Sequence, residues 1–420
     1  MPVRVVIAGQ GYVGLPLAMR AAECGHDVVG YDVDAGRVSR LAAGESFVED
    51  ISSERLQAAL GSGRYRATMD EADCAGFDIA LITVPTPLRD GIPDLSYVEA
   101  SADLFSRYLR PGATVVLEST TYPGTTQELV GPILEKGSGL TAGIDFYLGF
   151  SPERIDPGNP TWGLVNTPKI VAGIDEHSLK KVKEFYDGIV ETTVTVTSPR
   201  EAELAKLIEN TFRSVNIALI NEIAMLAHDL DVDVWQAIDA ASSKPFGFMR
   251  FTPGPGVGGH CLPIDPAYLS WRVQRTLGQS FRFVELANDI NNHMPDYVVR
   301  RLGDALNRRF RSVAGTRVLL LGLAYKKNTG DARESPAVRV AQLLTQLGAN
   351  VRAADPHVVE AAHGMEDIVR VGLSEQELSA ADVVVLLADH DEFDYDLIEK
   401  HAKYILDTRR RLSGPNVEVI

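Results

Sequence analysis

The chain has 420 residues, of which 45% are hydrophobic and 23% charged, and its formal net charge is −16. This is ordinary globular composition, and the length suits two or three domains of roughly 100 to 200 residues each. The negative charge argues against nucleic acid or an anionic membrane as a partner, so any phosphate-bearing ligand must be held by a local cluster of donors.

The three cysteines, Cys24, Cys74 and Cys261, are far apart in the sequence and include no closely spaced metal-binding pair. We therefore expect neither a disulfide framework nor a metal site. No apolar run approaches the roughly 18 residues of a membrane-spanning helix, and Met1 leads straight into a strand rather than a signal peptide. These features predict a cytoplasmic protein with no membrane partner.

The first part of the chain alternates between short apolar runs and helical stretches. Residues 4–8 form an apolar run that Gly9 closes, and apolar residues then recur at helical spacing from Leu15 to Ala22. Further runs typical of strands cover 26–31, 79–84 and 114–117. This alternation predicts a doubly wound parallel sheet over residues 1–200.

The middle of the chain is helical. The pattern is unbroken over 201–229, and it continues from 265 to 310 apart from interruptions at Gly278 and Pro295. After Gly315 the alternation returns, with strands expected at 317–321, 350–354, 382–388 and 404–406. The predicted fold class is α/β, with two Rossmann-like doubly wound parallel sheets joined by a helical central domain. The expected domains are 1–200, 201–312 and 313–420, and the helical one is the expected dimerisation region.

The two ends of the chain look like distant copies of one unit. The run Val5–Gly9 parallels Leu319–Gly322, and Asp78–Ile82 parallels Asp382–Leu386. In such units the carboxyl ends of the strands face a crevice that binds nucleotides. Two of them suggest one cleft, with a dinucleotide on one wall and a second nucleotide on the other.

A glycine fingerprint follows the first predicted strand. Gly9, Gly11 and Gly14 form GxGxxG at the start of a helix, with Tyr12 and Val13 between them, which is typical of a turn that places a pyrophosphate at the helix N-terminus. Asp32 ends the second strand about 20 residues on, where a carboxylate accepts hydrogen bonds from ribose hydroxyls and repels a 2′-phosphate. The motif predicts NAD rather than NADP; the alternative is a plain glycine turn with a solvated Asp32.

The segment Pro253–Pro266 carries the most information. Its glycines and prolines suit a loop whose backbone lies close to a ligand, and Cys261 near its end precedes a helix whose N-terminus would stabilise a thiolate. We interpret Cys261 as a nucleophile, against the alternative of a buried apolar cysteine. A dyad with His260 is disfavoured because adjacent residues on an extended loop point apart.

Three further groups are candidates. Glu153 follows a predicted strand at 146–150 and is expected at its end, the alternative being a surface ion pair. Lys206 and Asn210, four residues apart, share one helix face, with Leu204, Leu207 and Ile208 on the opposing side; a solvated polar face would have the same pattern. The segment Glu118–Gly124 ends another strand and supplies hydroxyls.

These segments together resemble the UDP-glucose/GDP-mannose dehydrogenase family along nearly the whole chain. The motifs occur in the family's order: the glycine fingerprint, Val84–Pro87, Ser119–Gly124, Ser151–Arg154, Glu203–Asn210, the Cys261 loop and Gly322–Pro336. The motifs nearest to this chain are those of the UDP-N-acetylhexosamine branch. Where the UDP-glucose branch has a lysine and a second acid, this chain has Ile264 and Pro157.

The resemblance implies roles for individual residues. Arg37, Thr86, Thr120 and Arg333 join Asp32 and the glycine turn as NAD contacts. The implied substrate contacts are Glu153, Arg154, Lys206, Asn210, Phe251, Gly258, Tyr325, Lys326 and Arg409, of which Lys326 and Arg409 anchor the diphosphate.

The implied reaction is the four-electron oxidation of the C6 alcohol of a UDP- or dTDP-hexose to a uronic acid, through a thioester on Cys261. Lys206 and Asn210 would stabilise oxyanions, while Asp265, Glu153 and Thr120 would position and deprotonate water. The sequence leaves open which carboxylate is the base, which hexose is oxidised and whether the nucleotide base is uracil or thymine.

Two other classes of protein remain as alternatives. A single-step β-hydroxyacid dehydrogenase would share the fold order but gives no reason for Cys261 or for the second α/β domain. A non-catalytic NAD-binding regulator would not need Lys206, Asn210, Cys261 and Asp265. We therefore expect a homodimeric NAD-dependent enzyme that binds a nucleoside-diphosphate hexose and no nucleic acid.

Overall fold

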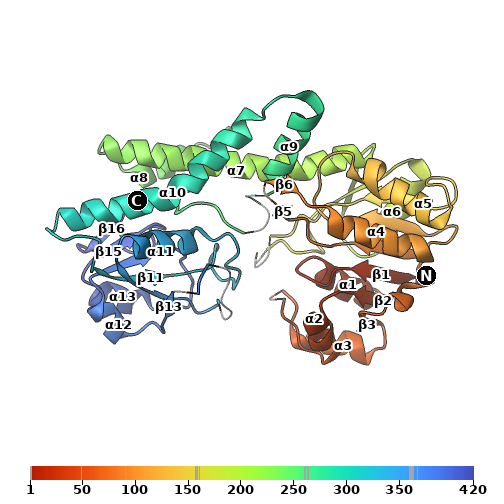
Figure 1. Cartoon of the computed structure of the whole chain (residues 1–420), viewed down its shortest axis with the longest axis horizontal. Helices are drawn as coiled ribbons and strands as arrows, with labels where there is room; N and C mark the ends of the chain where they lie inside the picture. Colours follow the sequence, from red (N-terminus) through yellow and green to blue (C-terminus); the bar gives the residue numbers. More distant parts are fainter. Residues whose placement is uncertain are drawn as a thin grey trace. The chain divides into compact units, whose positions relative to one another are not determined.

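The structure is a computed structural model that describes residues 2–48, 50–89, 91–156, 159, 161–259, 262, 264–358, 364–366 and 368–420. The chain divides into two compact units, Met1–Glu209 and Asn210–Ile420 (Figure 1). Cys261, His260 and Pro157, on which parts of the sequence interpretation depend, lie outside the described residues.

A sheet of eight strands forms the first unit, in the order β10-β9-β8-β7-β4-β1-β2-β3. Its pairings are parallel except for β8 with β9, which is antiparallel. The strands are β1 (Arg4–Ala8), β2 (Asp27–Tyr31), β3 (Tyr65–Thr68), β4 (Ile79–Ile82), β7 (Thr114–Leu117), β8 (Tyr147–Phe150), β9 (Lys169–Gly173) and β10 (Thr193–Thr195). A short hairpin pairs β5 (Leu88–Arg89) with β6 (Ile92–Pro93).

Helices surround this sheet, as buried parallel strands require. They are α1 (Gly14–Glu23), α2 (Ala35–Ala42), α3 (Ser53–Gly61), α4 (Ser96–Tyr108), α5 (Gly131–Ser138) and α6 (Glu176–Asp187), with short turns η1 (Glu71–Cys74) and η2 (Thr126–Val130). The apolar stripe of α1 lies in one core cluster with Val5 and Ile7 of β1. The strand, glycine turn and helix predicted at the start of the chain are confirmed, as is the parallel sheet apart from the antiparallel pairing of β8 with β9.

The helical region begins with α7 (Pro199–Asp229), and the division between the two units falls within this helix. It continues with α8 (Val234–Ser242), α9 (Asp265–Leu277) and α10 (Arg282–Asn307). Gly278 ends α9 as predicted, in the left-handed conformation with φ +65°.

The expected break at Pro295 is wrong, because α10 runs through it. Proline removes one helix hydrogen bond, but Pro295 is buried and the neighbouring residues Met294, Val298 and Leu302 belong to a core cluster of the second unit. Burial of this helix face outweighs the local cost of the proline.

The second unit contains a parallel sheet in the order β13-β12-β11-β14-β15-β16. Its strands are β11 (Arg317–Leu321), β12 (Asn350–Ala354), β13 (Val369–Arg370), β14 (Val383–Leu386), β15 (Ile405–Asp407) and β16 (Val417–Val419), and its helices are α11 (Pro336–Gln346), α12 (Glu375–Ala380) and α13 (Tyr395–His401). Successive residues of β11 and β14 enter two different core clusters, so both faces of the sheet are covered. The predicted second Rossmann-like sheet is confirmed.

The same hydrogen bonds recur in the two sheets. Arg4 N donates to Asp78 Oδ2 at 2.8 Å, and Arg317 N donates to Asp382 Oδ2 at 3.0 Å. Gly9 and Gly322 directly follow β1 and β11, with φ values of +92° and +87°. These equivalent contacts occur at equivalent positions of the two sheets, which supports the interpretation of the two ends of the chain as copies of one unit.

Candidate functional site

The glycine turn after β1 has the geometry of a dinucleotide-binding loop. A Cβ atom at Gly9 would lie 2.8 Å from Thr83 O, and one at Gly14 would lie 1.8 Å from Gly9 O, so both positions require glycine. A Cβ at Gly11 would meet nothing within 4 Å, which leaves its backbone open to a ligand. Helix α1 begins without a side-chain cap and without an acidic residue in its first turn, so its N–H groups are suited to a pyrophosphate.

Asp32 lies at the carboxyl end of β2, beside this turn. Its Oδ2 accepts from Gln10 N at 2.8 Å and its Oδ1 accepts from Asp34 N at 3.0 Å, while Arg37 Nη1 is 3.7 Å from Oδ2. The residue is only 5% exposed, so the alternative of a solvated Asp32 does not hold. The turn, the helix end and the carboxylate together fit NAD.

The loops that follow β4 and β7 bring two predicted cofactor contacts together. The buried Thr86 donates from Oγ1 to Thr120 O at 2.9 Å, and Ser119 Oγ donates to Val84 O at 2.7 Å. Thr121 Oγ1 is buried without a hydrogen-bond partner in the described chain. Both loops stand at the carboxyl ends of adjacent parallel strands, the edge at which such sheets bind ligands.

Three charged side chains are buried together at this same edge, and the sequence analysis missed one of them. Lys169 Nζ lies 2.8 Å from Glu118 Oε2 and 3.0 Å from Glu153 Oε2. Glu118 follows β7 and Glu153 follows β8, whereas Lys169 begins β9. Because β9 is antiparallel to β8, its first residue lies where those strands end. The sequence did contain a signal for this residue, because Lys169 is a charged residue at the start of the apolar run that forms β9.

Burial and pairing shift the pKa values of this cluster in different directions. Burial raises the pKa of Glu118, which also accepts a hydrogen bond from the Tyr186 hydroxyl. Burial alone would raise the pKa of Glu153, but the charge of Lys169 and the hydrogen bond from Ile155 N outweigh this effect, so the pKa is lowered. Burial alone would lower the pKa of Lys169, but the two carboxylates outweigh this effect, so the pKa is raised. Glu153 is therefore held ionised.

Glu153 is also fixed by the backbone. Its Oε1 accepts from Arg154 N at 2.6 Å and from Ile155 N at 2.7 Å. Arg154 itself pairs with Glu209 at 2.6 Å and donates to Pro168 O. The ion pair of Glu153 is a buried one, so the alternative of a surface ion pair is wrong.

Lys206 is buried on α7, with 8% exposure, which rules out a solvated polar face. On the opposing side Leu204 and Ile208 are exposed, whereas Leu207 is buried. One turn earlier, the buried Glu203 accepts from Gly124 N, from Thr126 N at 2.9 Å and from Thr126 Oγ1 at 2.7 Å. Glu203 thus attaches the helix that carries Lys206 to the loop after β7.

Asn210 and Asp265 come together in the second unit. Asn210 Nδ2 donates to Asp265 Oδ2, and Asp265 is 2% exposed at the first residue of α9. Two predicted catalytic residues, 55 positions apart, therefore join α7 to α9.

The described part of the Cys261 loop packs closely against its own unit. A Cβ at Gly258 would lie 2.6 Å from Glu334 O and 2.7 Å from Tyr325 Cβ, and Gly259 N donates to Arg333 O at 3.0 Å. The sequence predicted that the backbone of this loop lies close to a ligand; at these two glycines it lies close to other residues of the protein instead. Earlier in the loop, Gly254 N donates to Asn221 Oδ1 at 3.0 Å.

A basic cavity of about 450 Å³ lies in the second unit. Its lining residues are Trp235, Arg250, Thr252, Asp389, Arg409 and Arg410. Arg409 donates from Nε to Leu387 O at 2.8 Å, and Arg250 and Arg410 pair with the two oxygens of Asp239, each at 2.6 Å. Three guanidinium groups around one hollow suit a phosphate-bearing ligand.

The remaining predicted contacts are more exposed. Tyr12 is 39% exposed, and Arg333 is exposed and pairs with Asp331 at 2.7 Å. Lys326 is half-buried, as is Phe251, whose ring centroid lies 5.9 Å from that of Phe212. Within the described ranges, no three His, Cys, Asp or Glu side chains form a metal-binding group, and no helix is long and apolar enough to cross a membrane.

These features define an NAD-binding oxidoreductase whose second Rossmann-like unit carries a cavity lined by arginines. Comparison with known families matches residues 3–190, 200–293 and 319–414 to the NAD binding, central and UDP binding domains of the UDP-glucose/GDP-mannose dehydrogenase family. The chain belongs to this family, and it is an NAD-dependent nucleotide-sugar dehydrogenase.

Its relatives include dehydrogenases of N-acetylated sugar nucleotides. UDP-N-acetyl-D-mannosamine dehydrogenase of Pyrococcus horikoshii is 36% identical, with 99% of this chain and 98% of that protein covered. UDP-N-acetyl-D-glucosamine 6-dehydrogenase of Pseudomonas aeruginosa is 35% identical, with 93% and 91% covered. A solved structure of the UDP-D-ManNAc dehydrogenase from Pyrococcus horikoshii has a TM-score of 0.89 at 34% identity, with 99% of each chain covered.

Proposed function

We propose that the substrate is a UDP-N-acetylhexosamine, whose C6 alcohol the enzyme oxidises to the carboxylate. The observation that carries this proposal is the similarity over nearly the full length to dehydrogenases of UDP-N-acetyl-D-mannosamine and UDP-N-acetyl-D-glucosamine. Ile264 and Pro157, at the positions where the UDP-glucose branch has a lysine and a second acid, agree with it.

NAD is held in this proposal by the turn Gly9–Gly14, by Asp32 and Arg37, and by Thr86, Thr120 and Arg333. When bound, it supplies the hydride acceptor for each of the two oxidations. We assign the carboxylate of Asp32 to the ribose hydroxyls and the start of α1 to the pyrophosphate. Support comes from the open approach to Gly11 and from the burial of Asp32.

The sugar nucleotide is assigned to the contacts that the family resemblance implies. Lys326 and Arg409 anchor the diphosphate, and the basic cavity around Arg409 supports this role. The other proposed contacts are Glu153, Arg154, Lys206, Asn210, Phe251, Gly258 and Tyr325.

Catalysis proceeds by covalent trapping on Cys261. In the first oxidation, C6 loses a hydride and its hydroxyl loses a proton, which gives an aldehyde. The Cys261 thiolate adds to the aldehyde carbon, and the new C–S bond creates a thiohemiacetal oxyanion that Lys206 and Asn210 stabilise. Loss of a second hydride gives a thioester, and water then breaks the C–S bond to release the carboxylate and the thiolate.

Water is activated for this last step by Glu153, Asp265 and Thr120. Lys169 keeps the Glu153 carboxylate in the ionised form that a base requires; the same contact lowers its pKa and so makes it a weaker base than a free carboxylate. Asp265 holds the amide of Asn210, which orients an oxyanion donor. We assign Glu153 as the base and Asp265 as a positioning residue.

We also propose the three-domain division 1–200, 201–312 and 313–420 and a cytoplasmic homodimer. Helix α7 exposes the apolar side chains Phe212, Leu219, Ile223 and Leu226, and the exposed Leu230 directly follows the helix, so these side chains recur every three, four or seven residues. A stripe with this spacing is suited to packing against the same helix of a second copy. Changing Ile223 and Leu226 together to lysine is expected to yield a monomer in sedimentation velocity; an unchanged dimer would exclude this face.

The experiment that tests the proposed reaction counts NADH per substrate over a panel of UDP- and dTDP-hexoses. The expected result is two NADH per molecule, with the highest kcat/KM for a UDP-N-acetylhexosamine. One NADH per molecule would point to a single-step hydroxyacid dehydrogenase, and none to a regulator. A preference for UDP-glucose would overturn the substrate assignment while keeping the reaction.

A further inference from the structure

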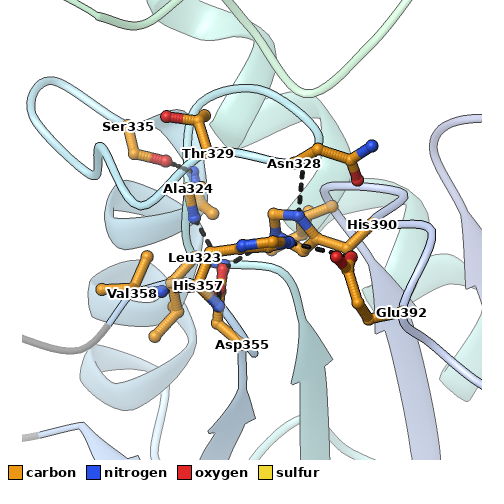
Figure 2. A network of polar contacts seen from close by, with 12 residues as sticks. Leu323, Ala324, Asn328, Thr329, Ser335, Asp355, His357, Val358, His390 and Glu392 are labelled. Carbon is orange, nitrogen blue, oxygen red and sulfur yellow. Dashed lines mark hydrogen bonds and ion pairs between the residues drawn. The ribbon is translucent and has the colours of Figure 1, made fainter. Parts of the chain in front are cut away.

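The second Rossmann-like unit has an aspartate, Asp355, at the position that Asp32 holds in the first. Both residues follow the second strand of their sheet, β2 or β12. Figure 2 shows Asp355 at the centre of a polar network. Its Oδ2 accepts from Leu323 N at 2.6 Å and Ala324 N at 3.0 Å, and its Oδ1 accepts from His357 N at 2.8 Å and Val358 N at 2.9 Å.

A fifth donor to Asp355 is the fully buried side chain of His390. The Nε2 atom of His390 lies 3.0 Å from Asp355 Oδ2, and its Nδ1 lies 2.9 Å from Asn328 N (Figure 2). Because the Asn328 N–H is a donor, Nδ1 must accept and carries no proton. The imidazole is therefore neutral, with its proton on Nε2 directed at Asp355.

His390 occupies the position equivalent to Thr86 of the first unit. Thr86 follows the end of β4 by four residues, and His390 follows the end of β14 by four; the matched bonds of Asp78 and Asp382 align these strands. In the first unit, Asp32 accepts two backbone N–H groups, which leaves lone pairs for a ribose. An ionised carboxylate has about four lone-pair sites, so the five donors around Asp355 leave none.

The loop that carries Lys326 is attached to His390. Asn328 has a φ of +56°, and its side chain exchanges two hydrogen bonds with Asp391, from Nδ2 to Oδ2 at 2.6 Å and from Asp391 N to Oδ1 at 2.9 Å. Asp389, the neighbour of His390, lines the basic cavity with Arg409. The buried imidazole of His390 thus contacts the Lys326 loop, and its neighbour along the chain lines the cavity.

We propose that His390 is a positioning residue for sugar-nucleotide binding: through Nδ1 it fixes the Lys326 loop, and through Nε2 it closes the place against Asp355 that the ribose of a dinucleotide would take. This role rests on the proposed function of Lys326 as a diphosphate anchor. It also gives a reason why two similar sheets in one chain take different ligands.

Two substitutions separate the two nitrogens of the ring. In His390→Asn, the amide oxygen lies near the place of Nδ1 and keeps an acceptor for Asn328 N, but the donor to Asp355 is lost. In His390→Gln, the amide nitrogen lies near the place of Nε2 and keeps the donor, but the acceptor is lost. Glu392→Gln is the matched control, since Glu392 is exposed and the hydrogen bond of its carboxylate seen in the described chain is to the ring of His357, at 2.8 Å, and not to His390 or Asp355.

The measurements use the full-length enzyme: the Kd of UDP by calorimetry, the KM of the sugar nucleotide, the KM of NAD and the Tm. We expect His390→Gln to weaken UDP binding and raise the sugar-nucleotide KM about tenfold, the value of one lost buried hydrogen bond, with the KM of NAD unchanged. His390→Asn is expected to lower the Tm but to keep the Kd of UDP within about twofold of the wild type. Glu392→Gln is expected to change neither the Tm nor the Kd of UDP.

A purely structural role would give a different pattern. If UDP affinity falls in proportion to the loss of Tm in both His390 variants, or falls in neither, the positioning role is wrong. Lys326→Ala separates this failure from failure of the proposed function. If Lys326→Ala weakens UDP binding and His390→Gln does not, only the role of His390 is overturned; if Lys326→Ala binds UDP normally, the anchor assignment fails and the role of His390 falls with it.

Discussion

The ammonium group of Lys169 lies 3.0 Å from Glu153 Oε2, and the lysine side chain is only 3% exposed. It is also 2.8 Å from Glu118 Oε2, so one buried cation serves two carboxylates. A buried ion pair of this kind adds little net stability, but removal of one partner leaves an uncompensated charge. The contact links the stability of the first unit to the state of the proposed base.

Lys169→Met is expected to destabilise the protein by roughly 3–5 kcal/mol at neutral pH, because two carboxylates then face each other without a cation. In the wild type, the lowered pKa of Glu153 contributes stability above its unfolded pKa, and this is lost as the pH falls through the folded value, whereas the raised pKa of Glu118 contributes stability that is lost as the pH rises. In the variant, burial raises both carboxyl pKa values above their unfolded values. The folded state then binds more protons, and its stability falls as the pH rises.

Thermal unfolding at pH 5 and pH 8 measures this change in the pH dependence of stability. The Tm of Lys169→Met should be higher at pH 5 than at pH 8. Lys180→Met, in which an exposed lysine 4.0 Å from Glu184 is lost, is the matched control and should follow the wild type. A variant with the pH dependence of the wild type would show that the pair does not set the ionisation of Glu153.

Glu153→Gln is expected to slow hydrolysis of the thioester more than its formation, since the amide keeps the shape of the side chain but accepts a proton poorly. The enzyme incubated with NAD and substrate should then carry the uronyl adduct on Cys261, detectable by mass spectrometry of the intact protein. Glu209→Gln, which removes only the partner of Arg154, is the control. Adduct accumulation in Asp265→Asn but not in Glu153→Gln would exchange the two assigned roles.

Cys261→Ala should lower net four-electron turnover at least about a thousandfold, because the second hydride must leave a tetrahedral carbon that the thiolate creates. Cys261→Ser should behave alike, since a serine alkoxide is scarcely populated near neutral pH. Both variants should retain the Kd values for NAD and UDP. Full product formation by Cys261→Ala near the wild-type rate would eliminate the covalent mechanism.

Asp32→Asn should weaken NAD binding and narrow the preference for NAD over NADP by about tenfold, the value of one hydrogen bond to a charged group. The substitution removes the negative charge and leaves Arg37, now 3.7 Å from Asp32 Oδ2, available to a 2′-phosphate. Asp34→Asn retains the N-cap of α2 and is the control. Comparable wild-type turnover with NADP would contradict the role of Asp32.

The sequence alone determined the class of protein, because local signals sufficed. Val5, Val6 and Ile7 before Gly9 report a buried strand and a turn, and Asp32 follows at a fixed interval, since both features lie within one supersecondary unit. The second sheet could be predicted in the same way, because its strands repeat the apolar runs of the first sheet. A proline such as Pro295 predicts a helix break from sequence, but α10 continues through it because the burial of this helix is a property of the packed unit.

Tertiary structure decided how the charged and polar side chains pair. Glu118, Glu153 and Lys169 meet because β9 runs antiparallel to β8, and strand direction leaves no periodic mark in the sequence. His390 reaches Asp355 and Asn328 across 35 and 62 residues for the same reason, as the order of the strands and not their spacing brings the loops together. A sequence pattern reports which face a residue takes; the partner it finds there depends on which strands become neighbours.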